Sequence, residues 1–94
     1  MVKIVWSNAA KEDLKEIKAY ISKDSPEYAQ IFTEHLFEKL KLLEFFPKMG
    51  RSVPESDDLY DRELIFQNYR LVYKYNQDKV EVISIIHGSR NLKL

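Results

Sequence analysis

The alternation of hydrophobic and polar positions divides the chain into one strand, two helices, a loop and three further strands. Residues 2–6 are mainly β-branched or aromatic and predict a strand. Ser7 follows as a candidate N-cap, and apolar side chains then recur every three or four residues. This spacing predicts a helix over residues 8–22 with one hydrophobic stripe. The stripe consists of Ala10, Leu14, Ile17 and Ile21.

A second helix is predicted to begin after Ser25, where Pro26 suits the first helical turn because its missing N–H costs nothing there. The helical pattern continues to about Phe46, and Pro47 then stops it. Two helices joined by so short a break should form an antiparallel hairpin whose apolar stripes face a common core. The second stripe consists of Ala29, Phe32, Leu36, Leu40 and Leu43.

Residues 47–60 contain two prolines, a glycine and three acidic residues, and this composition predicts a surface loop. Three strands separated by short turns are predicted to follow, so the sheet should be largely antiparallel. The predicted strands are residues 61–66, 69–75 and 80–87. The fold class is therefore α+β: an N-terminal strand, an antiparallel helix hairpin and three strands, with the hairpin packed on a small, mainly antiparallel sheet.

The last two strands can be aligned if Gln77 and Asp78 form a two-residue turn. Lys74 then lies opposite Glu81, which is a favourable cross-strand pair. One face of the two strands is more apolar and is expected under the helices; it carries Tyr69, Leu71, Tyr73, Tyr75, Val80, Val82, Ser84 and Ile86. The other face is half polar; it carries Arg70, Val72, Lys74, Glu81, Ile83, Ile85 and His87.

The composition indicates one folded domain over residues 1–94. The chain is 45% hydrophobic and 13% aromatic, so it can bury a core. It has no cysteine, which excludes a disulfide scaffold and a thiolate zinc site. The apolar run at the N-terminus is too short for a secretory signal or a membrane span. We therefore expect a soluble cytoplasmic protein with no membrane partner.

The formal net charge of zero hides an uneven distribution. Residues 1–61 carry 9 Lys and Arg against 12 Asp and Glu, whereas residues 62–94 carry 6 against 3. A neutral total argues against strong nonspecific binding to nucleic acid. The positive last third either faces an acidic partner or is ordinary surface charge.

Candidate chemistry lies on the half-polar face of the predicted sheet. In the assumed register His87 is the diagonal neighbour of Arg70, about 7–8 Å away between backbones. An arginine fork holds phosphate and an imidazole moves protons near neutral pH, so this pair, with Arg90 close by, would suit RNA cleavage. The alternative is that these side chains are solvated or bonded to carboxylates such as Glu63. The two histidines lie far apart without an acidic cluster, so we expect no metal site and no cofactor.

Several short motifs, taken in order, resemble the RelE/ParE toxins of type II toxin–antitoxin systems. The similarity covers nearly the whole chain, and it implies a toxin held silent in a complex with a cognate antitoxin, whose C-terminal segment wraps the helices and the sheet. The motifs are the opening strand with Ala9, Leu14 and Ile17, Phe46-Pro47 with Gly50-Arg51, Arg62-Glu63-Leu64, Asn68-Tyr69-Arg70-Leu71-Val72-Tyr73, and Ile86-His87-Gly88-Ser89-Arg90.

The resemblance implies one of two targets. ParE-like members poison DNA gyrase by binding it, whereas RelE-like members enter the ribosomal A site and cleave mRNA. The tail His-Gly-Ser-Arg and the neutral charge favour the ParE-like branch, so gyrase poisoning is predicted and mRNA cleavage is the alternative. A non-toxic binding module on the same scaffold is a third interpretation, because fold does not dictate activity.

The predicted site residues depend on the branch. If the chain is RelE-like, the resemblance makes Arg70, His87 and Arg90 the catalytic residues. For either target, the predicted binding residues are Arg51, Arg62, Lys74 and Arg90. Residues 51–61 could contact the antitoxin or the target, and the sequence leaves that choice open.

Overall fold

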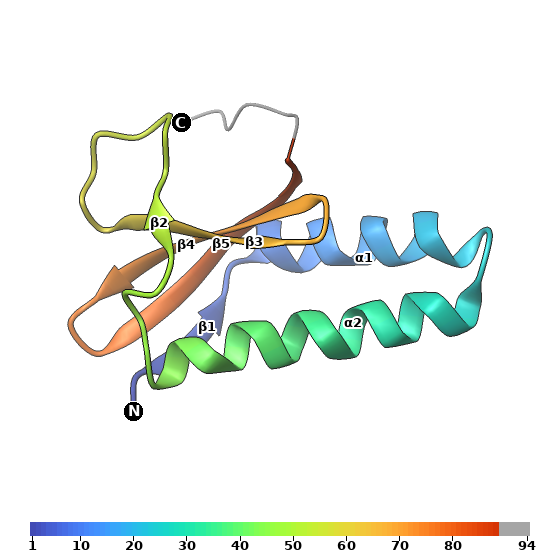
Figure 1. Ribbon diagram of the computed structural model, residues 1–94, viewed down its shortest axis with the longest axis horizontal. Helices are drawn as coiled ribbons and strands as arrows, with labels where there is room; N and C mark the ends of the chain where they lie inside the picture. The colour runs from blue at the N-terminus through green and yellow to red at the C-terminus, as the bar shows by residue number, and fades with distance from the viewer. Residues whose placement is uncertain (89–94) are drawn as a thin grey trace.

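The structure, a computed structural model, describes residues 1–88 and consists of a helix hairpin packed on one face of a five-stranded sheet (Figure 1). Residues 89–94 lie outside the described part of the chain, and with them the predicted site residue Arg90. The helical elements are α1 (Asn8–Ser22), α2 (Pro26–Lys41) and the 3₁₀ turn η1 (Leu42–Glu44). The strands are β1 (Lys3–Trp6), β2 (Arg51–Ser52), β3 (Asp61–Phe66), β4 (Tyr69–Asn76) and β5 (Lys79–His87).

The helix starts are where the capping residues predict them. Ser7 Oγ accepts a hydrogen bond from the Ala10 N–H at 3.0 Å, and Ser25 Oγ accepts one from Tyr28 at 3.1 Å. The second helix ends at Lys41 rather than near Phe46, because its last turn tightens into η1 while the apolar stripe continues. Neither helix within residues 1–88 has the length and apolar content that a membrane crossing requires.

The sheet is mixed, in the order β1-β5-β4-β3-β2. β1 runs parallel to β5, and the other neighbours pair antiparallel, so the predicted α+β fold is confirmed. The strand β2 was not predicted: the interpretation of residues 47–60 as loop alone was wrong at Arg51 and Ser52, which pair with Glu63 and Arg62. Two residues show no alternation, so no periodic signal marks such a strand.

The register of β4 with β5 changes partway along the pair. Near the Gln77-Asp78 turn it is as predicted, with Lys74 opposite Glu81. Between Val72 and Tyr73 a bulge shifts it by one position, because β5 contributes one residue more than β4 there. Beyond the bulge Arg70 lies opposite Ile86, and the predicted Arg70–Ile85 pairing is wrong.

The helices cover the face of the sheet that the tyrosines of β4 predict. Leu71 and Tyr73 are fully buried in the core, and Tyr69 and Tyr75 pack against it. On β5 the prediction was wrong past the bulge, where Ile85 rather than Ile86 joins the core. The core also contains both helix stripes and two further β5 positions; its buried members include Ala10, Leu14, Phe32, Leu36, Leu40, Leu43, Val80 and Val82.

Candidate functional site

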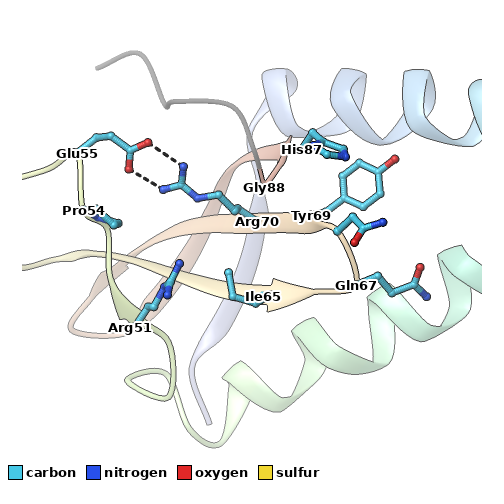
Figure 2. A pocket seen from close by; sticks show the side chains of 10 residues that line it. Arg51, Pro54, Glu55, Ile65, Gln67, Tyr69, Arg70, His87 and Gly88 are labelled. Atoms are coloured by element: carbon cyan, nitrogen blue, oxygen red, sulfur yellow. Dashed lines mark hydrogen bonds and ion pairs between the residues drawn. The ribbon is translucent and has the colours of Figure 1, made fainter.

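A buried arginine lies on the outer face of the sheet, the face turned away from the helices. Arg70, on β4, has a side chain that is only 7% exposed. Its two terminal nitrogens donate to the two carboxylate oxygens of Glu55 at 2.7 and 2.6 Å (Figure 2). Its Nε and Nη2 donate to Glu63 Oε1 at 2.8 and 2.6 Å. The alternative interpretation, that Arg70 bonds a carboxylate such as Glu63, is therefore confirmed.

Glu63 joins this arginine to a second one. Its side chain, on β3, is fully buried, and its other oxygen, Oε2, accepts a hydrogen bond from Arg51 Nε at 2.7 Å and forms an ion pair with Arg51 Nη2, also at 2.7 Å. Arg51, Glu55, Glu63 and Arg70 thus form one ion network that links β2, the following loop, β3 and β4. Burying these charges costs desolvation free energy, and the removal of one partner leaves a charge that is far more costly than the intact pair. The network therefore fixes the loop onto the outer face.

Arg70 carries a fixed positive charge. The bidentate bond to Glu55 raises the pKa of Arg70 most strongly, burial opposes that rise, and Glu63 adds to it. Because an arginine is already protonated at every pH at which proteins fold, the guanidinium remains a cation and cannot transfer protons. Its available chemistry is the electrostatic binding of anions, and the two carboxylates already occupy much of that capacity.

His87 points away from this network. The bulge places it opposite Tyr69, and the two rings meet edge to face with centroids 5.7 Å apart. Figure 2 shows the Arg70 guanidinium directed toward Glu55, while the imidazole lies on the other side, beside Tyr69. The expected convergence of Arg70 and His87 on one face is therefore wrong, because the register prediction did not include the bulge. Both residues still line one hollow of about 690 Å³.

The predicted target-binding cations have different surroundings. Arg51 is 61% exposed but belongs to the ion network. Lys74 Nζ lies 2.8 Å from Asp58 and 3.0 Å from Asp61, and its hydrogen bond to Asp58 raises the pKa of the lysine and lowers that of Asp58. Arg62 instead donates to backbone carbonyls, and within residues 1–88 it forms no ion pair.

A buried tyrosine holds the segment that leads into β2. The Tyr73 hydroxyl donates to the carbonyl of Pro47 at 2.8 Å and accepts from the Gly50 N–H at 3.0 Å. A Cβ on Gly50 would lie 2.6 Å from this hydroxyl, so only glycine fits. No pattern in the sequence indicates this contact or the role of Glu55. Gly50 entered only through the resemblance, and nothing in the local pattern indicates that it meets Tyr73.

A further carboxylate binds the edge of β5 beyond the residues that pair with β1. β1 ends at Trp6, opposite Val82, and the next part of the β5 edge faces α1. Asp13, on α1, accepts hydrogen bonds from the Ile85 N–H at 2.9 Å and from the Ser84 hydroxyl at 3.2 Å. Asp13 therefore has a structural role. Within the described residues, no group of three or more His, Asp or Glu side chains is placed to hold a metal ion.

Comparisons with known proteins identify the class. A family model described as "ParE toxin of type II toxin-antitoxin system, parDE" matches residues 4–92. The fold is similar to a chain of the solved structure "Chromosomal ParDE TA system from P. aeruginosa", with 21% sequence identity, a TM-score of 0.75 and coverage of 93% of this chain and 96% of that one. No curated protein sequence matches the chain.

The fold and the family match thus define a toxin of the type II toxin–antitoxin class, and the resemblance to the RelE/ParE toxins is confirmed. Within that class, the chain belongs to the ParE toxin family. A cognate antitoxin is accordingly its partner.

Proposed function

We propose that this toxin arrests growth by binding and poisoning DNA gyrase. The observation that carries the proposal is the match of residues 4–92 to the ParE family. Membership in this family implies DNA gyrase as the target. Such a toxin needs no reaction chemistry of its own. It needs a surface that binds one state of the enzyme more tightly than the others.

The geometry of the outer face supports this proposal over RNA cleavage. A nuclease needs a cation at the scissile phosphate and a proton carrier beside it. Here Arg70 is buried between two carboxylates, and His87 lies against Tyr69. A phosphate would have to displace Glu55 to reach both terminal nitrogens of the guanidinium, and the imidazole would still point elsewhere.

The residues proposed to contact the target are the basic ones predicted from the sequence. Of these, Arg62 has its charge uncompensated by a carboxylate within the described residues. Arg51 and Lys74 are paired with carboxylates, and we propose that their side chains, 61% and 34% exposed, contribute at the edge of an interface. Arg90 is proposed as a contact on sequence grounds alone.

Expression of the chain without its antitoxin tests the proposal in cells. Gyrase poisoning should stop DNA replication before protein synthesis and induce the DNA-damage response. A strain with a gyrase variant that escapes the toxin should grow. If protein synthesis stops first while supercoiling and replication continue normally, gyrase is not the target.

A ribosome-dependent mRNA endonuclease is the second candidate, favoured by one observation: Arg70 and His87 line the same hollow. Under this candidate Arg70, His87 and Arg90 would be catalytic, and induction should leave cuts in mRNA at codon-linked positions. The Arg70→Ala/His87→Ala double variant should then lose cleavage. Because Arg70 also stabilises the fold, His87→Ala alone, with an unchanged melting temperature, is the cleaner variant.

A further inference from the structure

One end of the molecule carries exposed apolar side chains beside two cations. There the segment after η1, the loop before β3 and the β4–β5 turn meet (Figure 1). Two hollows of about 390 Å³ each have Lys48 in common, and we treat their combined lining as one surface. We call it the end surface; its main members are Phe46, Lys48, Met49, Leu59, Tyr60 and Arg62.

The apolar members are unusually exposed. Leu59 is 86% exposed, Phe46 62% and Tyr60 57%. Single apolar residues on a surface are ordinary, but several that line connected hollows mark a site where another molecule binds. The core of the protein does not need these side chains, since none of them belongs to the buried cluster.

The backbone beneath this surface is held in place without a partner. The Tyr73 hydroxyl binds Pro47 and Gly50, and the Arg62 guanidinium donates to the carbonyls of Lys48 and Gly50 at 3.2 and 2.8 Å. These bonds fix a segment that presents apolar side chains to solvent. A preformed surface of this kind loses little conformational entropy on binding, which favours affinity.

The charge of the end surface indicates the chemistry of the occupant. Neither Lys48 nor Arg62 forms an ion pair with any residue in 1–88. The neighbouring carboxylates of Asp58 and Asp61 are paired with Lys74. The charged residues that line the two hollows are both cations, Lys48 and Arg62. Asp58 and Asp61 together outnumber their partner Lys74 by one charge, so these five residues carry a net charge of +1. The lining itself is positive, and it complements a segment that combines carboxylates with apolar side chains.

We propose that the end surface docks onto an acidic, apolar-bearing segment of the protein that the toxin inhibits. The inference rests on the proposed function in one respect, which is that the target is a protein. The position favours the target over the antitoxin. The molecule measures 39 × 29 × 21 Å, and the segments that carry the surface lie at the end of its long axis opposite the α1–α2 turn (Figure 1). The flanks, including the helix hairpin, remain available to a second partner.

Two double variants test this docking surface. The test variants are Leu59→Ala/Tyr60→Ala and Lys48→Glu/Phe46→Ala, which alter exposed side chains and leave the Tyr73 and Arg62 hydrogen bonds intact. The control is Tyr20→Ala/Lys23→Glu, which makes the same kinds of change near the α1–α2 turn. Each is induced without antitoxin, and growth arrest and trapping of purified gyrase on DNA are measured. Both test variants should keep the melting temperature and antitoxin binding of the wild type, and lose at least about tenfold in growth arrest and trapping. The control should behave as the wild type.

The outcomes separate the two proposals. Folded test variants that arrest growth like the wild type, or a control that weakens equally, overturn the docking surface. Test variants that keep arrest but escape neutralisation assign the surface to the antitoxin and also overturn it. If the wild type arrests growth without trapping gyrase, the gyrase proposal fails, and growth arrest by the variants still decides the docking surface. A wild-type chain that does not arrest growth contradicts both.

Discussion

Arg70 and Glu55 form a two-pronged ion pair in which both terminal nitrogens of the guanidinium meet both oxygens of the carboxylate, at 2.7 and 2.6 Å. The arginine comes from the middle of the sheet and the glutamate from the loop that follows β2. The pair therefore fastens this loop over the outer face, next to Glu63, which is itself fully buried. It also occupies the guanidinium that would have to bind phosphate if the chain cleaved RNA.

Removing the carboxylate of Glu55 or of Glu63 should destabilise the protein, and the loss should be larger for Glu63. Glu55→Ala removes the partially exposed partner while Glu63 remains, so we expect a loss of about 1–3 kcal/mol in the free energy of unfolding. Glu63→Ala leaves two arginines without their buried carboxylate and should cost about 3–5 kcal/mol. Urea unfolding measures both, and Glu12→Ala, an exposed position on α1, is the control, expected within about 0.5 kcal/mol of wild type. A Glu55 variant as stable as this control would show that the loop is held by other contacts.

The buried hydroxyl of Tyr73 predicts a loss of stability at alkaline pH. Burial raises the pKa of this phenol above its ordinary value of 10.0, so between that value and the folded pKa the folded state binds more protons than the unfolded state. Its contribution is complete below pH 10 and is lost as the pH rises through the folded pKa. Unfolding measured from pH 8 to 12 should show this decline, and Tyr73→Phe should show a shallower one.

The same variant measures the two hydrogen bonds of the hydroxyl. Tyr73→Phe leaves the Gly50 N–H and the Pro47 carbonyl without this partner and should cost about 1–3 kcal/mol at neutral pH. Equal stability of the variant and the wild type would mean that solvent replaces both bonds at no cost.

Gly50 should tolerate no side chain. A Cβ would lie 2.6 Å from the Tyr73 hydroxyl and 2.8 Å from the Glu63 carbonyl oxygen, so the strand or the tyrosine must move. We expect Gly50→Ala to cost about 1–3 kcal/mol by overpacking. Gly88→Ala is the matched control, because among residues 1–88 its Cβ would meet the backbone of Asn68, at 3.2 Å, and the substitution should cost less. A smaller effect at Gly50 than at Gly88 would contradict the close approach.

Asp13 should protect the exposed edge of β5. Asp13→Ala removes the acceptor of the Ile85 N–H, so exchange of that amide with solvent should speed up, and stability should fall by about 1–3 kcal/mol. Asp13→Asn retains an acceptor oxygen and should restore most of the protection. Hydrogen exchange followed by NMR measures the exchange rate of the Ile85 amide in both variants. Unchanged exchange in the alanine variant would show that the edge is closed by something else.

The sequence predicts those parts of the fold that local spacing determines. The helix stripes, the caps Ser7 and Ser25 and the tyrosine face of β4 follow from periodicity and side-chain chemistry, and all are confirmed. The bulge beside Val72 does not, because the alternation within each strand does not show where one strand places an extra residue opposite its neighbour. One extra residue turned His87 to the other face.

The site was harder to predict for the same physical reason. The sequence suggested Glu63 as a partner of Arg70, since β3 and β4 are adjacent in a hairpin. The contribution of Glu55 depends on where a proline-containing loop settles, which no local pattern encodes. The end surface likewise could not be predicted from the sequence, because it is formed by three segments that are distant in the sequence.

The central proposal is tested most directly with purified gyrase, supercoiled plasmid and the toxin alone. We expect that the toxin traps gyrase on cleaved DNA, that linear plasmid accumulates with toxin concentration after denaturation, and that cognate antitoxin abolishes the product. Unbroken plasmid and normal supercoiling at a toxin concentration that arrests growth would contradict gyrase as the target.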